Sequence, residues 1–168
     1  CVTWSPYIYT DIGFKNFNNF INIGGLDVIS GHPNGRLHRK LTRVAFETIA
    51  DAWQPFAYGQ KAFAMHIALR FNIPLVFWGE NGEVEYGGSL VDADRPYEPI
   101  EHWEKHYFKG TNVDKLFKIA TEMGVIKKNE FPKTGLEFYK PPDFEKLRKL
   151  GIRHYWFSYF KKWVPQEN

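Results

Sequence analysis

The sequence predicts an α/β protein with a Rossmann-like, open and mostly parallel sheet that carries helices on both faces. Over residues 1–90, segments with the character of strands alternate with segments of helical periodicity. Such alternation is typical of the crossover units that build parallel sheets. The 168 residues, of which 43% are hydrophobic, also suffice for the core of one domain.

The N-terminal third of the chain predicts two strands separated by a helix. Cys1–Trp4 is apolar and resembles the end of a buried strand. A helix is expected over residues 14–23, where phenylalanines recur at helical spacing before a Gly-Gly pair. Residues 26–30 then predict a second strand, because a cluster of turn-forming residues follows at 31–35.

Two helices and a third strand are expected next. Apolar residues fall on one helical stripe over 36–49, and a second stripe covers 59–71 before Asn72. Residues 74–78 form an uninterrupted apolar run of strand length, which favours a strand covered on both faces. In parallel sheets ligands bind beyond the carboxyl ends of the strands, so the loops that begin at Ser5, Gly31 and Gly79 form the expected active edge.

Beyond Gly88 the alternation stops, and prolines are scattered among charged and aromatic residues. Short helices are expected over 113–123 and 143–150, each followed by a glycine. Residues 152–163 fit either a strand followed by a helix or one aromatic-rich helix. We therefore expect an α/β domain over 1–90 and a less regular helical continuation over 91–168, packed on the same domain.

Composition excludes several classes of protein. The formal charge of +3 is spread along the chain among 19 carboxylates, which is no signature of nucleic-acid binding. No apolar run approaches the roughly 18 residues of a membrane span. The single cysteine, Cys1, excludes an internal disulfide and a multi-cysteine zinc site, and it indicates a reducing, cytoplasmic compartment. Aromatic residues reach 18%, which favours a large core over sugar or base stacking.

The stretch 79–88, Gly-Glu-Asn-Gly-Glu-Val-Glu-Tyr-Gly-Gly, is the most informative part of the sequence. It places glycines, carboxylates and an amide directly after an apolar strand. Glycines let backbone N–H groups approach a ligand, and clustered carboxylates can hold a divalent cation or accept a proton. A solvated hairpin is the alternative explanation.

Basic residues at the start of the expected 36–49 helix suit an anion, since the helix dipole reinforces their charge. They are Arg36, His38, Arg39, Lys40 and Arg43. A solvated helix face explains them equally well. His102 and His106 are the only histidines at a metal-like spacing, and we expect no metal site from them. Motifs of P-loop kinases, dinucleotide enzymes and α/β hydrolases are absent.

Several of these motifs together resemble one family, the N-acetyl sugar amidotransferases of the PP-loop ATP-pyrophosphatase superfamily. The resemblance runs along essentially the whole chain, and the stretch 79–88 is its strongest motif. The other matching segments are Val2-Thr3-Trp4, Asp11-Ile12-Gly13 through Asn16-Phe17, Arg39-Lys40-Leu41-Thr42-Arg43, Gln60, Asn72-Ile73-Pro74 and residues 161–168.

The resemblance implies a fold of the adenine nucleotide alpha hydrolase (HUP) type and an ATP- and Mg²⁺-dependent enzyme. It would convert the acetamido group of an activated bacterial sugar to an acetamidino group in lipopolysaccharide, O-antigen or flagellin glycan biosynthesis. A glutaminase-type partner subunit would supply ammonia. Family members carry a Ser-Gly-Gly-x-Asp-Ser type loop after the first strand, which this chain lacks. We therefore expect an internal portion of a longer protein, inactive by itself.

The resemblance also implies roles for individual residues. Glu80, Glu83 and Glu85 would position Mg²⁺ or accept a proton, while Asn81 would orient the amide. The predicted cofactor contacts are Thr3, Trp4 and Gly79, and the predicted contacts to the sugar or its phosphates are Arg39, Arg43 and Gln60. Two alternatives stay open: another PP-loop enzyme, such as a tRNA-modifying enzyme or an amide ligase, and a non-enzymatic glycan-binding module.

Overall fold

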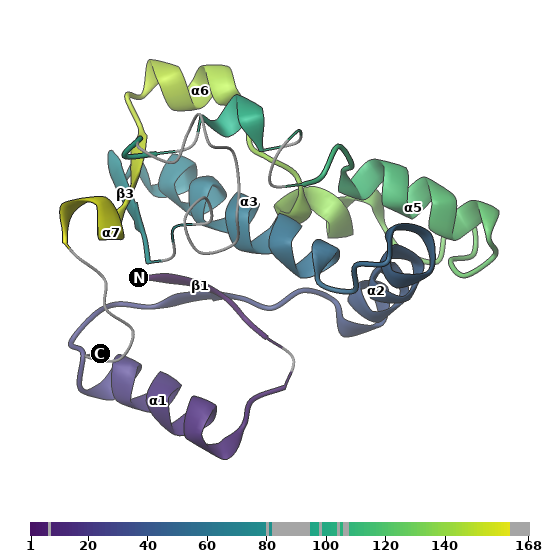
Figure 1. Cartoon of the computed structure of the whole chain (residues 1–168), viewed down its shortest axis with the longest axis horizontal. Helices are drawn as coiled ribbons and strands as arrows, with labels where there is room; N and C mark the ends of the chain where they lie inside the picture. Colours follow the sequence, from purple (N-terminus) through teal and green to yellow (C-terminus); the bar gives the residue numbers. More distant parts are fainter. Residues whose placement is uncertain are drawn as a thin grey trace. The chain divides into compact units, whose positions relative to one another are not determined.

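The computed structural model describes residues 1–6, 8–79, 81, 95–97, 99–103, 105 and 108–161 (Figure 1). The chain divides into two compact units, each built from two stretches of sequence. Unit 1 comprises Cys1–Ala64 and Val113–Lys140, and unit 2 comprises Met65–Asn112 and Pro141–Asn168. The sequence-predicted boundary at residue 90 lies outside the described residues, so the division at that point stays a prediction.

Unit 1 begins with a parallel crossover. Strand β1 (Val2–Trp4) pairs with β2 (Ile29–Gly31), and helix α1 (Asp11–Asn22) connects them. Parallel strands require such a crossover, which is what the alternating sequence pattern predicted. Helix α1 begins earlier than expected because the Thr10 hydroxyl accepts a hydrogen bond from the Gly13 N–H and caps it.

Helix α2 (Gly35–Ile49) supplies much of the core of unit 1. It places Leu37, Leu41, Val44 and Ala45 on one buried stripe, as predicted. These side chains face α5 (Val113–Glu122), which buries its own apolar stripe. The 3-10 helix η2 (Lys133–Tyr139) completes this unit together with the first part of α3 (Gln54–Phe71).

Helix α3 starts five residues before its predicted start at Gly59. Pro55 suits the first turn, where its missing N–H has no partner to lose. The helix is buried over most of its circumference between Gln54 and Ala68, so apolar and polar residues do not separate into a clear stripe. Periodicity therefore detects its end better than its start.

Unit 2 holds a second parallel pair, β3 (Leu75–Trp78) and β4 (Arg153–Trp156). Its other elements within the described residues are the second part of α3, η1 (Ile100–His102), α6 (Phe144–Lys149) and α7 (Phe157–Phe160). The strand-then-helix alternative for residues 152–163 is thus correct. The expectation that β3 is covered on both faces is wrong, because Leu75 is 40% and Phe77 50% exposed.

The protein is therefore a mixed α/β chain with two small parallel sheets. Within the described residues each sheet has two strands, and one continuous Rossmann-like sheet is not among them. No helix in the described part of the chain combines the length and apolarity needed to cross a membrane.

Candidate functional site

The carboxyl ends of β1 and β2 lie side by side in unit 1, where a parallel sheet normally binds its ligand. The pairing sets Thr3 against Ser30, and their hydroxyls hydrogen bond at 3.1 Å. The Ser5 N–H continues the ladder by donating to the Gly31 carbonyl at 2.9 Å. Thr3 is half-buried, so its hydroxyl stands at the predicted edge in a fixed orientation.

Trp4, the other predicted cofactor contact of β1, is a core residue in this structure. Its ring lies 5.4 Å from Phe63 and 5.4 Å from Tyr139, and its side chain is 8% exposed. Gly59 lets the indole approach α3 closely, since a Cβ there would stand 2.1 Å from Trp4 Cε2. Protein atoms therefore cover most of the indole surface that an adenine would need.

His38 extends this cluster on the side of α2. Its Nδ1 lies 2.9 Å from the Tyr139 hydroxyl, and the residue is 7% exposed. Burial lowers the pKa of His38 from 6.5 to about 4, because the imidazolium would lose its hydration. His38 is thus neutral near pH 7 and contributes packing and one hydrogen bond, not positive charge for an anion.

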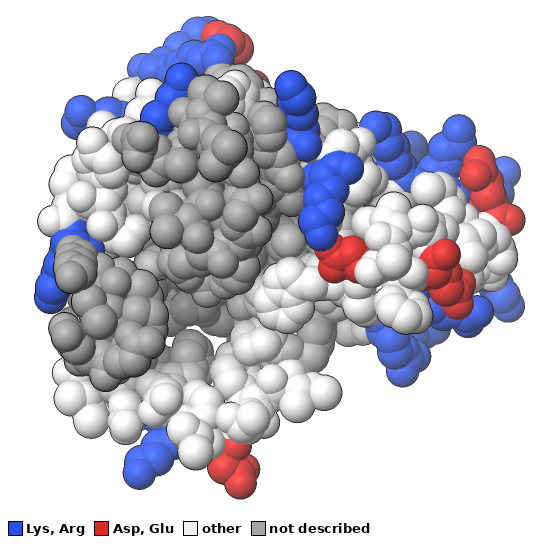
Figure 2. Space-filling model, in the orientation of Figure 1, with Lys and Arg blue, Asp and Glu red and all other residues white. Residues whose placement is uncertain are grey.

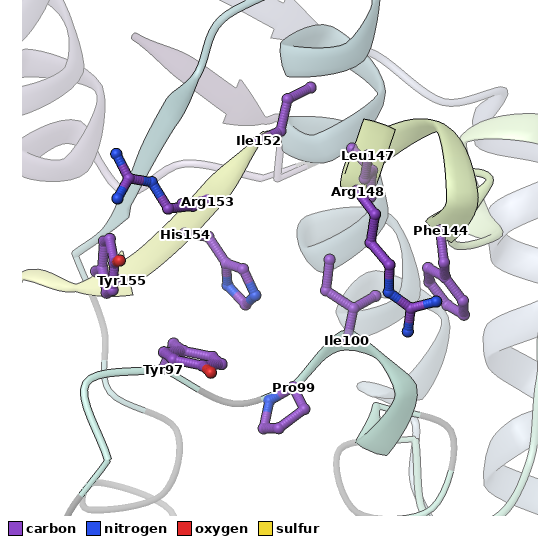
Figure 3. Close-up of a pocket in the computed structure, with 10 residues that line it drawn as sticks. All are labelled: Tyr97, Pro99, Ile100, Phe144, Leu147, Arg148, Ile152, Arg153, His154 and Tyr155. Carbon is purple, nitrogen blue, oxygen red and sulfur yellow. The ribbon is translucent and has the colours of Figure 1, made fainter. Parts of the chain in front are cut away.

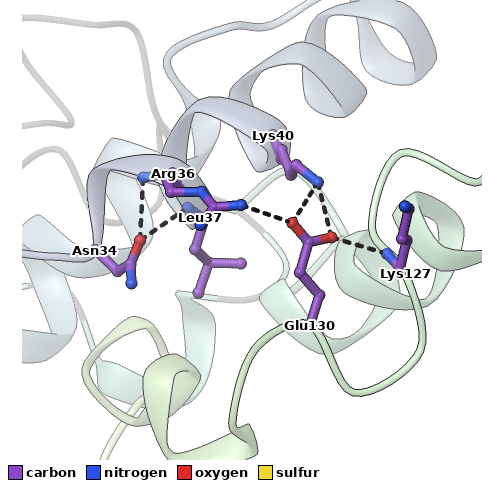
Figure 4. A network of polar contacts seen from close by, with 6 residues as sticks. All are labelled: Asn34, Arg36, Leu37, Lys40, Lys127 and Glu130. Carbon is purple, nitrogen blue, oxygen red and sulfur yellow. Dashed lines mark hydrogen bonds and ion pairs between the residues drawn. The ribbon is translucent and has the colours of Figure 1, made fainter.

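The predicted anion site at the start of α2 is largely occupied by the protein itself (Figure 4). Asn34 Oδ1 accepts the N–H groups of Arg36 and Leu37 at 3.0 and 3.1 Å. Lys40 Nζ lies 2.7 Å from both carboxylate oxygens of Glu130, which Arg36 also approaches at 3.5 Å. The hydrogen bond from Lys40 is the main cause that lowers the pKa of Glu130, and the hydrogen bond from the Lys127 N–H lowers it further. A carboxylate far along the sequence thus takes the place of the expected anion.

Two further basic residues of α2, Arg39 and Arg43, lie on the outer face of the helix. Arg39 and Arg43 stand one turn apart and are exposed, on the side opposite the buried stripe. Arg43 Nε donates to Glu47 at 2.8 Å. Their assignment to phosphate or sugar contacts stays a prediction, and any such contact would be made from the outer face of α2.

The other predicted site residues are divided between the units. Gln60 is half-buried on α3 in unit 1, beside the Gly59 that receives Trp4. Gly79 follows β3 in unit 2, with open space around its Cβ position, and Asn81 is 6% exposed. Glu80, Glu83 and Glu85 lie outside the described residues.

Metal ligands do not cluster in the described part of the chain. No group of three or more His, Cys, Asp or Glu side chains there could hold a metal ion. His102 lies in η1, while His106, the histidine four residues later, is outside the described residues. The Mg²⁺ ligands expected in the stretch 79–88 are therefore untested.

Sequence reasoning missed a pocket of about 360 Å³ in unit 2 (Figure 3). It is bounded by the segment that leads into η1, by α6 and by β4. Its described lining consists of Tyr97, Pro99, Ile100, Phe144, Leu147, Arg148, Ile152, Arg153, His154 and Tyr155. No local pattern marks these residues, because the pocket forms only when two stretches some fifty residues apart fold together.

No protein-family model matches this chain, and no curated protein matches it. The functional interpretation therefore depends on the sequence motifs, on the resemblance they carry and on the geometry of the two units. The geometry offers two places for a ligand, the carboxyl edge of β1 and β2 and the pocket beside β4.

Proposed function

We propose that this chain is part of a cytoplasmic, ATP-dependent amidotransferase that converts the acetamido group of an activated bacterial sugar into an acetamidino group. The resemblance of the stretch 79–88 and of the shorter motifs to N-acetyl sugar amidotransferases supports this proposal. Lipopolysaccharide O-antigen or flagellin glycan synthesis would use such a product. The proposal includes a Rossmann-like sheet of the HUP type.

The observation that carries the proposal is the arrangement at the carboxyl edge of β1 and β2. Two parallel strands in register present the Thr3–Ser30 hydroxyl pair, and β2 leads through a short turn into the N-terminus of α2. Ligands of parallel α/β sheets usually bind at this edge. Because Asn34 and Glu130 already occupy the polar groups at the start of α2, the nucleotide contact is proposed for the strand ends themselves. The half-buried Thr3 is a better candidate for this contact than the enclosed Trp4.

The chemistry requires activation of a poor electrophile. ATP would supply it by adenylylating the amide oxygen with release of pyrophosphate, after which ammonia displaces AMP and leaves the amidine. In this scheme Asn81 holds the amide in position, and its near-complete burial suits a fixed orientation. Glu80, Glu83 and Glu85 bind Mg²⁺ or accept the proton that ammonia loses on attack.

The substrate and the ammonia source follow from the same scheme. Arg39 and Arg43 are the proposed contacts to the phosphates of the sugar carrier, because guanidinium groups bind phosphate in bidentate geometry. Gln60 would contact the same substrate. Near pH 7 free ammonia is mostly protonated, so a glutaminase partner subunit with a sheltered route is part of the proposal.

The test is mass analysis of acetamido nucleotide sugars incubated with the complete protein, ATP, Mg²⁺ and an ammonium salt. Amidine formation replaces an oxygen by NH, so the product is about one mass unit lighter, and AMP and pyrophosphate appear with it. The Glu80→Gln variant should lose the reaction, whereas Glu122→Gln, which removes an exposed carboxylate of α5, should keep it.

Other results would replace the proposal. ATP consumption that depends on tRNA and not on an acetamido sugar would identify a different PP-loop enzyme. Sugar binding without any ATP consumption, unaffected by Glu80→Gln, would identify a glycan-binding module.

A further inference from the structure

The pocket beside β4 is a candidate binding site that none of the sequence motifs predicts. Its volume of about 360 Å³ lies at the small end of the range for small-molecule sites, roughly 300 to 1,000 Å³. That volume suits a ligand with one ring and one further group better than a dinucleotide or a sugar nucleotide.

One part of the pocket is apolar and ring-lined. Ile100, Leu147 and Ile152 supply aliphatic surface, and Figure 3 shows His154 pointing from β4 toward Tyr97 and Ile100. The Tyr97 ring packs edge-on against His154 at 5.8 Å. Surfaces of this kind accept the C–H face of a sugar ring, which is apolar although its edge carries hydroxyls.

His154 adds a directional polar group to this wall. The Trp78 Nε1–H donates to His154 Nδ1 at 3.0 Å, and an indole nitrogen can only donate. Nδ1 must therefore be the unprotonated nitrogen of a neutral ring, with the hydrogen on Nε2. The Trp78 hydrogen bond thus fixes the tautomer of a side chain that is 7% exposed.

Among the described lining residues, Arg148 and Arg153 carry a charge. Figure 3 shows the Arg148 guanidinium beside Ile100 and Phe144, while Arg153 extends on the other side of β4 from His154. Lys and Arg side chains also gather over α6 on the face drawn in Figure 2, which includes Lys146, Arg148 and Lys149 of its last turn. Arg148 is therefore the described lining residue placed to bind an anion at this side of the pocket.

Arg148 forms an exposed ion pair with Glu145. Its Nη1 lies 2.6 Å from Glu145 Oε1, but the two side chains are 58% and 69% exposed. Exposed ion pairs of this kind contribute little to stability, so a phosphate that binds both guanidinium nitrogens competes well with the carboxylate.

We propose that this pocket binds a phosphorylated monosaccharide, with the sugar ring between Ile100, Tyr97 and His154 and the phosphate at Arg148. The proposal rests on the proposed function and adds, in unit 2, a second site for a phosphorylated sugar besides the contacts proposed for Arg39, Arg43 and Gln60. Binding to the pocket needs neither ATP nor ammonia, so it is tested separately from catalysis.

The experiment is isothermal titration calorimetry of the complete protein with N-acetylglucosamine 1-phosphate, and separately with N-acetylglucosamine, inorganic phosphate and AMP. The sugar phosphate should bind more tightly than either of its parts and more tightly than AMP. Arg148→Gln should weaken its binding by about tenfold or more, the loss expected for one charge-assisted phosphate contact.

Two neighbours of Arg148 make the test specific. Glu145→Gln should tighten binding severalfold, because it removes the competing carboxylate. Lys149→Gln removes the same charge from an exposed residue of the same helix that does not line the pocket, and it should leave the affinity within about twofold. Tighter binding of AMP, equal losses in Arg148→Gln and Lys149→Gln, or no binding of the sugar phosphate would overturn the proposal. Failure of amidine formation in an otherwise binding-competent protein would overturn only the proposed function.

Discussion

Acidification should destabilise this protein through His38, a single buried imidazole. The side chain is 7% exposed and hydrogen bonds to the Tyr139 hydroxyl at 2.9 Å. Burial lowers its pKa to about 4, whereas in the unfolded chain it titrates near the ordinary value of 6.5. Between these two values the unfolded chain binds a proton that the folded chain excludes.

The magnitude follows from linkage between proton binding and folding. Above pH 6.5 both states are neutral at His38, so its contribution to stability is complete. As the pH falls from 6.5 toward 4, protonation of His38 in the unfolded chain lowers the free energy of unfolding by up to about 1.4 kcal/mol per pH unit. The loss reaches about 3 kcal/mol near pH 4, which is a large share of the typical stability of a domain.

Urea unfolding followed by tryptophan fluorescence at several pH values between about 7 and 4 measures this loss. Carboxylates of the unfolded chain also begin to titrate toward the acid end of this range, so the informative quantity is the difference between variants. His38→Gln should lower stability near pH 7 but remove the part of the pH slope that belongs to His38. His32→Gln, at an exposed histidine of the same unit, should keep the slope. Equal slopes in the wild type and in His38→Gln would refute the reasoning.

Three further changes test the packing and the capping of unit 1. Gly59→Ala forces a Cβ within 2.1 Å of the Trp4 indole. Although alanine has the better helix propensity, this variant should lower the free energy of unfolding in urea by about 1–3 kcal/mol. Gly135→Ala is the control and should be nearly neutral, because its Cβ would meet only Leu37 at 3.5 Å. Asn34→Ala removes the cap of α2 and should cost about 1 kcal/mol, which Asn34→Asp should largely restore. Glu130→Gln should lower stability at low salt and reduce its dependence on salt concentration, and an unchanged salt dependence would exclude an electrostatic role for this carboxylate.

Local sequence patterns predicted the helices that have one apolar and one polar face. The apolar stripe of α2 was recognisable because Leu37, Leu41 and Val44 face the core while exposed cations cover the other side. The start of α3 was not, since the polar Gln54 and Lys61 are as buried as the apolar Ala57 and Ala62. A helix buried on most sides has no periodic signal to locate its first turn.

Long-range partners could not be predicted from local patterns. The Phe77 and Tyr155 rings are neighbours because β3 pairs with β4, but nothing in the run 74–78 indicates a partner near residue 155. Its apolar character was interpreted as burial on both faces, whereas Phe77 packs among the aromatic side chains of β4 and α7 and stays half exposed. A strand in a half-exposed aromatic cluster can therefore have the same uninterrupted apolar sequence as a strand that is buried on both faces.

The two candidate phosphate sites differ in the partners that their basic residues already hold. The start of α2 looked like an anion site, but Glu130 is 15% exposed and is held by Lys40, Arg36 and a backbone N–H, so displacing it would break several contacts at once. Arg148 has the opposite character, because the Glu145 that it binds is exposed and lies only three residues away. A phosphate replaces such a partner at little cost in free energy. The exposure of the Arg148–Glu145 ion pair, more than the number of basic residues, thus supports the proposed phosphate site in the pocket beside β4 over one at the N-terminus of α2.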